Sequence, residues 1–220
     1  MYEWLIQNKD SLKIVYAFLI AIICLFIVKR TDKLFRLSEH QGIRYFRNAF
    51  LFYAIAFVAR YLFDPIISGY HYLTNAVFEY FLIMAGFFLL YSLIWKKFET
   101  IKPAYSSLFN PRIFTFYLMT LLIVIFDYIW STYSFMFLSQ LIIFIFATSI
   151  SFSNYRNNSK GKFLKFYFVA MLLSLIAWIL NSLAAIFSWN QLLVLNTYIL
   201  NTIIFILFLF GVIKFTSKNG

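Results

Sequence analysis

The sequence predicts an all-α integral membrane protein, a bundle of seven transmembrane helices with its N-terminus outside and its C-terminus in the cytoplasm. Hydrophobic residues make up 63% of the 220 residues and charged residues only 12%, whereas about half of the residues in a soluble domain are apolar. The charged residues cluster between apolar runs, and each run approaches the roughly 20 residues that cross the hydrocarbon of a bilayer. We therefore expect residues 1–220 to form a single membrane domain.

Seven apolar runs follow one another along the chain. The first is short enough to resemble a signal peptide, but Lys29 and Arg30 follow it without a small-residue cleavage site, which favours a retained helix. Asp64, Pro65 and Gly69 are typical of a turn after the second run. The predicted spans lie at about 12–28, 45–63, 72–95, 113–130, 134–152, 166–187 and 192–213.

The segments between the spans alternate in composition. Residues 29–47 form the longest predicted loop; basic and apolar residues alternate there, which favours a short helix lying on an anionic leaflet. Pro103 and Pro111 mark the loop between the third and fourth spans. Residues 131–133 predict a tight turn into the fifth span, and residues 188–191 join the sixth span to the seventh.

The orientation follows from the basic residues. Sixteen of the 19 Lys and Arg residues lie on the side reached after the first, third, fifth and seventh spans. The other side holds only Lys9 and Lys13, and Arg60 lies within a span. The positive-inside rule therefore places the basic side in the cytoplasm of a multi-pass cell-membrane protein, which we expect in a prokaryotic cytoplasmic membrane. The net charge of +11 then indicates anionic lipid as a partner rather than nucleic acid.

Two of the ionisable residues inside the predicted spans, Arg60 and Glu79, point to a site. Arg60 lies near the outer end of the second span and Glu79 about two turns into the third. A charge at such a depth costs roughly 2.5–3.5 kcal/mol on insertion scales, so it usually faces a partner or a wet cavity. Because consecutive spans pack side by side, we predict an Arg60–Glu79 ion pair, with Asp64 as a competing partner for Arg60.

Further polar and aromatic residues fall at a similar depth in the outer half of the bundle. One of them, Asn181, shares a helical stripe with Ser174, Trp178 and Ala185. These groups predict an outward-facing polar pocket, although single Asn and Gln residues also serve as hydrogen-bonding glue between helices, at roughly 0.6 kcal/mol per bond. The candidate ligand-binding residues are Arg60, Glu79, Asn75, Asp127, Gln140, Trp178, Asn181, Asn196 and Asn201.

The seven-span layout in about 220 residues resembles that of microbial rhodopsins, SWEET-type sugar transporters and the KDEL receptor. A rhodopsin needs a lysine in the middle of its last helix for the retinal Schiff base, whereas this chain has residues 200–203, Leu-Asn-Thr-Ile, there. All three prolines lie in predicted loops, unlike the helix-breaking prolines of SWEET-type proteins. With two histidines and Cys24 alone, the chain lacks a zinc-ligand set. We expect no cofactor and assign no family.

Three functional hypotheses remain open from the sequence. The first is a receptor-like, sensor-like or transporter-like protein that binds a small ligand in the outer pocket, where Arg60 would meet an anionic or hydroxylated group and Trp178 and Tyr80 would offer stacking surfaces. The second is a structural subunit whose polar residues only organise packing against a membrane-protein partner or a second copy. The third is an intramembrane enzyme acting on a lipid or isoprenoid, with Glu79 and Asp127 as an acid–base pair.

Overall fold

The computed structural model describes residues 9–38, 40–63, 71–98, 108, 111–157, 162–186 and 191–219, and these are almost entirely helical. A short π-helical segment, η1, continues α3 without a break. The elements are α2 (Lys9–Ser38), α3 (Gln41–Val58), η1 (Ala59–Phe63), α4 (His71–Phe98), α5 (Pro111–Trp130), α6 (Ser134–Asn157), α7 (Lys162–Ile186) and α8 (Gln191–Asn219).

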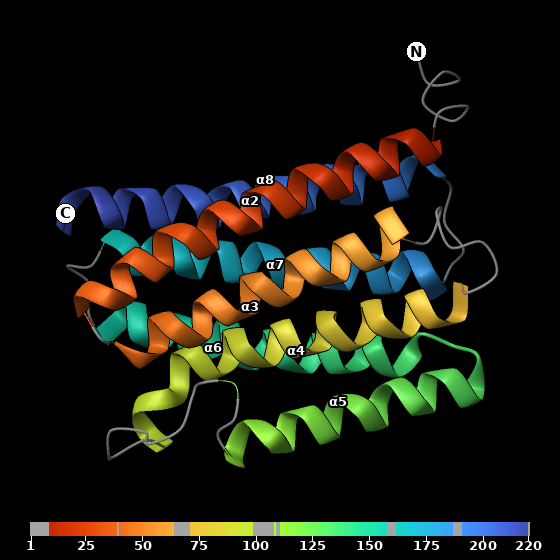
Figure 1. Ribbon diagram of the computed structural model, residues 1–220, viewed down its shortest axis with the longest axis horizontal. Coiled ribbons are helices and arrows are strands. Elements are labelled where there is room, and N and C mark those ends of the chain that lie inside the picture. Colours follow the sequence, from red (N-terminus) through yellow and green to blue (C-terminus); the bar gives the residue numbers. More distant parts are fainter. Residues whose placement is uncertain are drawn as a thin grey trace.

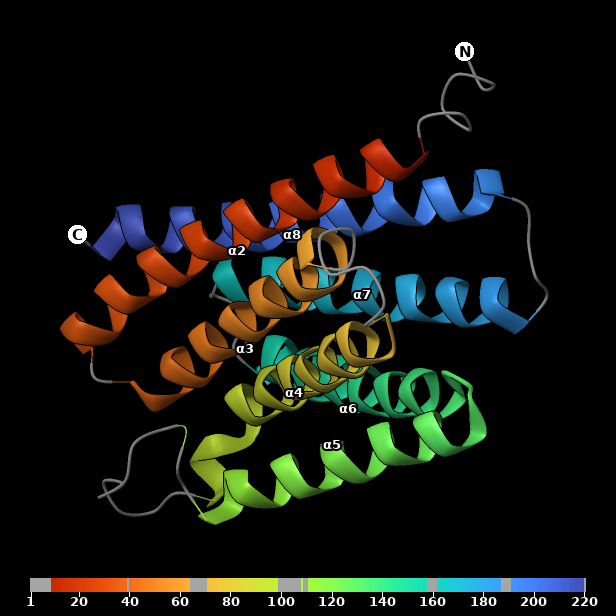
Figure 2. The ribbon, with the colours of Figure 1, turned by 45° about the vertical axis from the view of Figure 1, so that its right-hand side comes forward.

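Six of these helices form a closed ring, and α5 stands outside it. Going around the ring, α2 packs on α3, α3 on α4, α4 on α6, α6 on α7, α7 on α8, and α8 returns to α2. Helix α5 packs on α4 and α6, and it lies at the edge of the bundle opposite α2 and α8 in two views (Figures 1 and 2). The ring therefore encloses an interior to which six helices contribute side chains.

Five helical stretches are long and apolar enough to cross a bilayer, so the chain has the character of a membrane-embedded helical bundle. They are Ser11–Arg36, His71–Trp95, Pro111–Trp130, Ser134–Asn157 and Leu164–Ile186. Helix α3 is not among them; its first turns carry polar residues, among them Arg44 and Arg47. In α8 the apolar stretch is the shorter Tyr198–Lys214.

The expected loop at 29–47 is wrong, because α2 continues as a helix to Ser38 and α3 begins at Gln41. Two features explain the extra turns of α2. The side chain of Leu34 is buried against the bundle, and the hydroxyl of Thr31 donates to the Ile27 carbonyl at 2.7 Å. Interleaved apolar residues therefore anchor the basic segment to the ring as a continuation of α2.

Most of the described basic residues lie on the helix turns at one end of the bundle, the end at which α2, α4, α6 and α8 finish (Figure 1). There the Asp32 carboxylate accepts from Arg36 at 3.1 Å and also pairs with Arg47, which joins α2 to α3. Lys214 of α8 lies over the Phe166 ring of α7, with 4.9 Å between Nζ and the ring centroid. These contacts hold the basic ends of neighbouring helices together.

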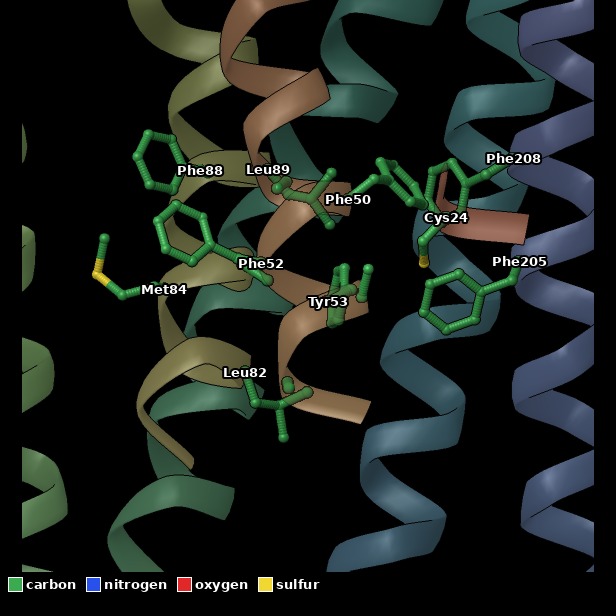
Figure 3. Close-up of a cluster of buried hydrophobic side chains, with 14 of the residues drawn as sticks. Cys24, Phe50, Phe52, Tyr53, Leu82, Met84, Phe88, Leu89, Phe205 and Phe208 are labelled. Atoms are coloured by element: carbon green, nitrogen blue, oxygen red, sulfur yellow. The ribbon is translucent and has the colours of Figure 1, made fainter. Parts of the chain in front are cut away.

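Aromatic side chains fill the middle of the ring. Phe50 of α3 meets Phe205 and Phe208 of α8 edge-on, with ring centroids 6.0 and 5.2 Å apart. On its other face α3 stacks Phe52 on Phe88 of α4 at 5.1 Å. Figure 3 shows these rings packed between α3, α4 and α8, with Leu89 and the buried Cys24 among them. Edge-to-face and stacked rings of this kind make the centre of the bundle a solid apolar layer.

Candidate functional site: two cavities of opposite charge

A cavity of about 330 Å³ lies inside the ring, with walls from α2, α3, η1, α4, α6, α7 and α8. We name it the Arg60 cavity. Four residues predicted to bind ligand line it together: Arg60, Trp178, Asn181 and Asn201. The stripe expected on α7 also faces it, through Ser174 and Ala185 as well as Trp178 and Asn181. The helical spacing of this stripe is what brings its members onto one wall.

The Arg60 cavity is polar at one end and apolar at the other. Its lining on α8 runs from Tyr198 to Phe208, ten residues of helix or about 15 Å at 1.5 Å per residue. Arg60 and Tyr198 stand toward the end where α2 begins, whereas Leu89, Phe144 and Phe208 stand deeper, next to the aromatic layer of Figure 3. An elongated ligand with one polar end matches this distribution.

Arg60 is held by aromatic rings. Its guanidinium carbon lies 4.5 Å from the centroid of Phe78, 5.8 Å from that of Tyr61 and 6.0 Å from that of Tyr133. Among the described residues no carboxylate lies within 4.0 Å of it. Cation–π contacts orient a guanidinium without neutralising it, so its charge remains available to an anionic group in the cavity.

A buried hydroxyl faces the same cavity. Tyr16 of α2 is 8% exposed, stacks on Tyr198 at 4.7 Å between centroids, and lines the cavity alongside Asn201. The side chain of Asn201 interacts with this hydroxyl. Tyr16 and Asn201 therefore form a polar patch on the wall of the cavity.

The predicted ion pair between Arg60 and Glu79 is not formed. Glu79 is 4% exposed, yet its carboxylate makes neither an ion pair nor a hydrogen bond with any described residue. The competing partner proposed for Arg60, Asp64, lies outside the described residues.

Two features of the backbone explain the missing pair. Phe78 and Glu79 are consecutive on α4, so their side chains diverge by about 100° around the helix; Phe78 lines the Arg60 cavity, and Glu79 is turned toward α5. Arg60 belongs to η1, and the wider turn of a π-helix changes the direction of its side chain from the α-helical projection. Arg60 and Glu79 can lie at a similar depth in the bundle without facing each other, because the depth of a residue does not determine the direction of its side chain.

A second cavity, of about 440 Å³, lies between the first turns of α4 and the α5–α6 turn. We name it the Glu79 cavity. It brings together three more of the predicted residues, Asn75, Glu79 and Asp127, with the tyrosines Tyr72, Tyr128 and Tyr133. The candidates that were expected in one pocket thus divide between two, one containing a guanidinium and the other carboxylates.

Asp127 already has a structural role. Its carboxylate accepts from the backbone N–H groups of Phe135 at 3.0 Å and Met136 at 2.7 Å, and from the Thr132 hydroxyl at 3.2 Å. The chain turns through Ser131, whose φ is 51°, and α6 begins at Ser134, which confirms the tight turn predicted at 131–133. Asp127 thus satisfies N–H groups in the first turn of α6 that have no partner within the helix.

Gln140 lines neither cavity, and it joins two helices. It is fully buried, and its amide nitrogen donates to the Leu82 carbonyl of α4 at 2.9 Å. Its Oε1 has no hydrogen-bond partner among the described residues and lies against Gly86, where a Cβ would be 2.9 Å from it. This is the packing role considered for single polar residues. The side chain of Asn196 lies outside the described residues.

Sequence reasoning missed most of the aromatic lining. The tyrosines Tyr16, Tyr53, Tyr61 and Tyr198 all face the Arg60 cavity, whereas Tyr80, expected to stack on a ligand, lines neither cavity and meets Phe81 edge-on at 5.6 Å. A usable signal was present for Tyr16 and Tyr53, because each lies inside a predicted span, away from the interface that tyrosine prefers.

Comparison with known proteins gives no match to this chain among family models, curated proteins or solved structures.

Proposed function

We propose that the chain is a seven-span membrane protein, N-terminus outside, that binds a small amphipathic ligand through an anionic group in the Arg60 cavity. The observation that carries this proposal is the convergence of Arg60, Trp178, Asn181 and Asn201 on one cavity inside a closed ring. The placement of basic residues at the opposite end of the bundle supports the orientation, because it makes the Arg60 end the outer one.

The chemistry of the walls indicates the class of ligand. The guanidinium of Arg60 can donate to a carboxylate, sulfonate or phosphate in two parallel hydrogen bonds, and the amides of Asn181 and Asn201 are further donors on the walls of the cavity. At the deeper end Leu89, Phe144 and Phe208 offer an apolar surface for a chain or ring. A volume of 330 Å³ lies at the lower end of the range for small-molecule pockets.

A receptor-like or sensor-like role fits the cavity better than a transporter-like role, which needs a polar path through the bundle. The cavity ends against the aromatic layer formed by Phe50, Phe205 and Phe208. A transporter of the same ligand would need polar groups to continue toward the basic end. Toward that end, the described hydroxyls of Thr31 and Thr148 bond backbone carbonyls, and Asn48 bonds the Arg47 side chain.

The proposal predicts that Arg60→Ala weakens binding of decanoate at least tenfold, because a hydrogen bond to a charged group contributes about 1.5–3 kcal/mol. The measurement is calorimetric titration of the purified protein in nanodiscs, with decanol as the uncharged probe of the same chain length. Arg60→Lys should retain part of the affinity, since the charge remains while the planar fork is lost.

Arg44→Ala is the matched control. Arg44 also lies over an aromatic ring, that of Phe35 at 5.4 Å, but at the basic end of the bundle. It should bind decanoate like the wild type. Equal binding of decanoate by Arg60→Ala, or equal affinity of the wild type for decanol and decanoate, would reject an anion site at Arg60.

A second candidate function is a structural subunit of a membrane assembly. It is favoured by Gln140 and Asp127, whose hydrogen bonds serve helix packing and capping. On this account the outer face of α5, with Phe114, Leu122 and Trp130 exposed, would meet a partner or a second copy in place of lipid. Wild-type protein that binds no probe but migrates as a defined oligomer in native mass spectrometry would favour it.

A further inference from the structure

We propose that the Glu79 cavity is a second binding site, separate from the Arg60 cavity, and that its ligand is an organic ammonium group. The cavity holds Glu79, Asn75 and Asp127 together with Tyr72, Tyr128 and Tyr133. Among the described residues that line it there is no Lys or Arg. Its charge is therefore opposite to that of the Arg60 cavity, and it calls for a different ligand.

Glu79 is the group that indicates a ligand. The residue is 4% exposed and lines the cavity, but its carboxylate makes no ion pair or hydrogen bond with any described residue. Asp127, the other carboxylate, is engaged by the first turn of α6. A buried carboxylate without a partner is costly, and at membrane depth such a residue usually serves a ligand or ion.

The size and lining of the cavity favour an organic cation over a metal ion. A volume of about 440 Å³ greatly exceeds the space of one ion. In the described part of the chain no three His, Cys, Asp or Glu side chains come together as metal ligands. Tyrosine rings attract an alkylated ammonium through their faces, while Glu79 supplies the opposite charge and Asn75 an amide oxygen.

The two sites share a wall. Phe78 lines the Arg60 cavity, and the guanidinium carbon of Arg60 lies 4.5 Å from its ring centroid. Its neighbour Glu79 lines the Glu79 cavity. The ring centroid of Tyr133 lies 6.0 Å from the guanidinium carbon of Arg60, and Tyr133 lines the Glu79 cavity. Arg60 is thus a cation behind the wall of the Glu79 cavity. Removing Arg60 should leave ammonium binding unchanged or make it tighter, while it weakens anion binding at least tenfold.

The test is titration of the full chain with tetramethylammonium chloride, in nanodiscs made of phosphatidylglycerol so that no lipid supplies an ammonium headgroup. We expect saturable binding to the wild type that Glu79→Gln weakens about tenfold or more, because glutamine keeps the shape but removes the charge. Tyr128→Leu should weaken it several-fold. Asp32→Asn, which neutralises a carboxylate at the opposite end of the bundle, should change nothing.

Two further arms make the result specific. Potassium chloride at the same concentration should not compete; full competition would assign the site to an inorganic cation and overturn the proposal. If tetramethylammonium binds more weakly in nanodiscs that contain phosphatidylcholine, the lipid headgroup competes and is a source of the ammonium group. If its binding is unchanged, the natural ligand is a free ammonium compound. A folded Glu79→Gln variant that binds tetramethylammonium like the wild type would overturn the proposal. This result does not depend on whether decanoate binds in the Arg60 cavity.

Discussion

Gly86→Leu is expected to cause the largest loss of stability of any single change considered, about 1–3 kcal/mol in the free energy of unfolding. Gly86 lies where α4 meets α6, and even a Cβ there would stand 2.9 Å from Gln140 Oε1 and 3.3 Å from Ile143 Cγ2. A leucine would push the two helices apart at the middle of the ring. Unfolding by SDS in mixed micelles, followed by circular dichroism and tryptophan fluorescence, measures the loss.

A graded series separates this effect from a general intolerance of the site. Gly86→Ala should cost less than Gly86→Leu, because the far end of the Gln140 side chain can move away from a single methyl group. Combining Gly86→Leu with Gln140→Ala should recover part of the loss, since the truncated side chain leaves room; this is the coupling expected of residues in contact. Strictly additive losses would show that Gly86 and Gln140 are not in contact.

Asp127→Ala is expected to destabilise the protein by about 1–2 kcal/mol, because it removes the acceptor for two backbone N–H groups at the start of α6. The Met136 donor is buried and the Phe135 donor is partly buried, and N–H groups in the first turn of a helix have no partner within the helix. Asp127→Asn should cost less, because one carbonyl oxygen remains. The same SDS titration measures each loss.

Asp32→Ala provides the comparison for a carboxylate that bonds only side chains. Its partners Arg36 and Arg47 are long and its own side chain is 31% exposed, so we expect at most about 1 kcal/mol. An Asp127→Ala variant no less stable than Asp32→Ala would contradict the capping role. Hydrogen exchange at Phe135 and Met136 should also rise in Asp127→Ala, since their amides lose their acceptor.

The general character of the fold could be predicted because hydropathy reports directly on the surrounding medium. Long apolar runs indicated membrane helices, and five of them have the length and composition required. The helix ends were less accurate. The charged residues after Val28 predict the end of the first span there, but α2 continues to Ser38, because lysine and arginine can extend toward water while their neighbours pack.

The candidate site could be predicted in part. The stripe Ser174, Trp178 and Asn181 depends on helical spacing alone, and these residues face one cavity. The division of Arg60 from Glu79 depends on the π-helical turn at η1 and on which face of α4 meets α5. Neither the π-helical turn nor the contact face of α4 can be predicted from hydropathy or from the depth of a residue in the bundle. The capping role of Asp127 required the geometry of the α5–α6 turn.

The most direct test of the Arg60 cavity uses Trp178, which lines it, as a reporter of occupancy. Of the five tryptophans, four are replaced by phenylalanine, and quenching by 10-bromodecanoate is measured in nanodiscs. A second variant keeps only Trp130, which is exposed on the outside of α5, and reports quencher dissolved in the lipid. We predict saturable quenching of Trp178 that Arg60→Ala abolishes, and weak, linear quenching of Trp130. Quenching of Trp178 that persists in Arg60→Ala, or that rises linearly like that of Trp130, would contradict an anion-binding cavity.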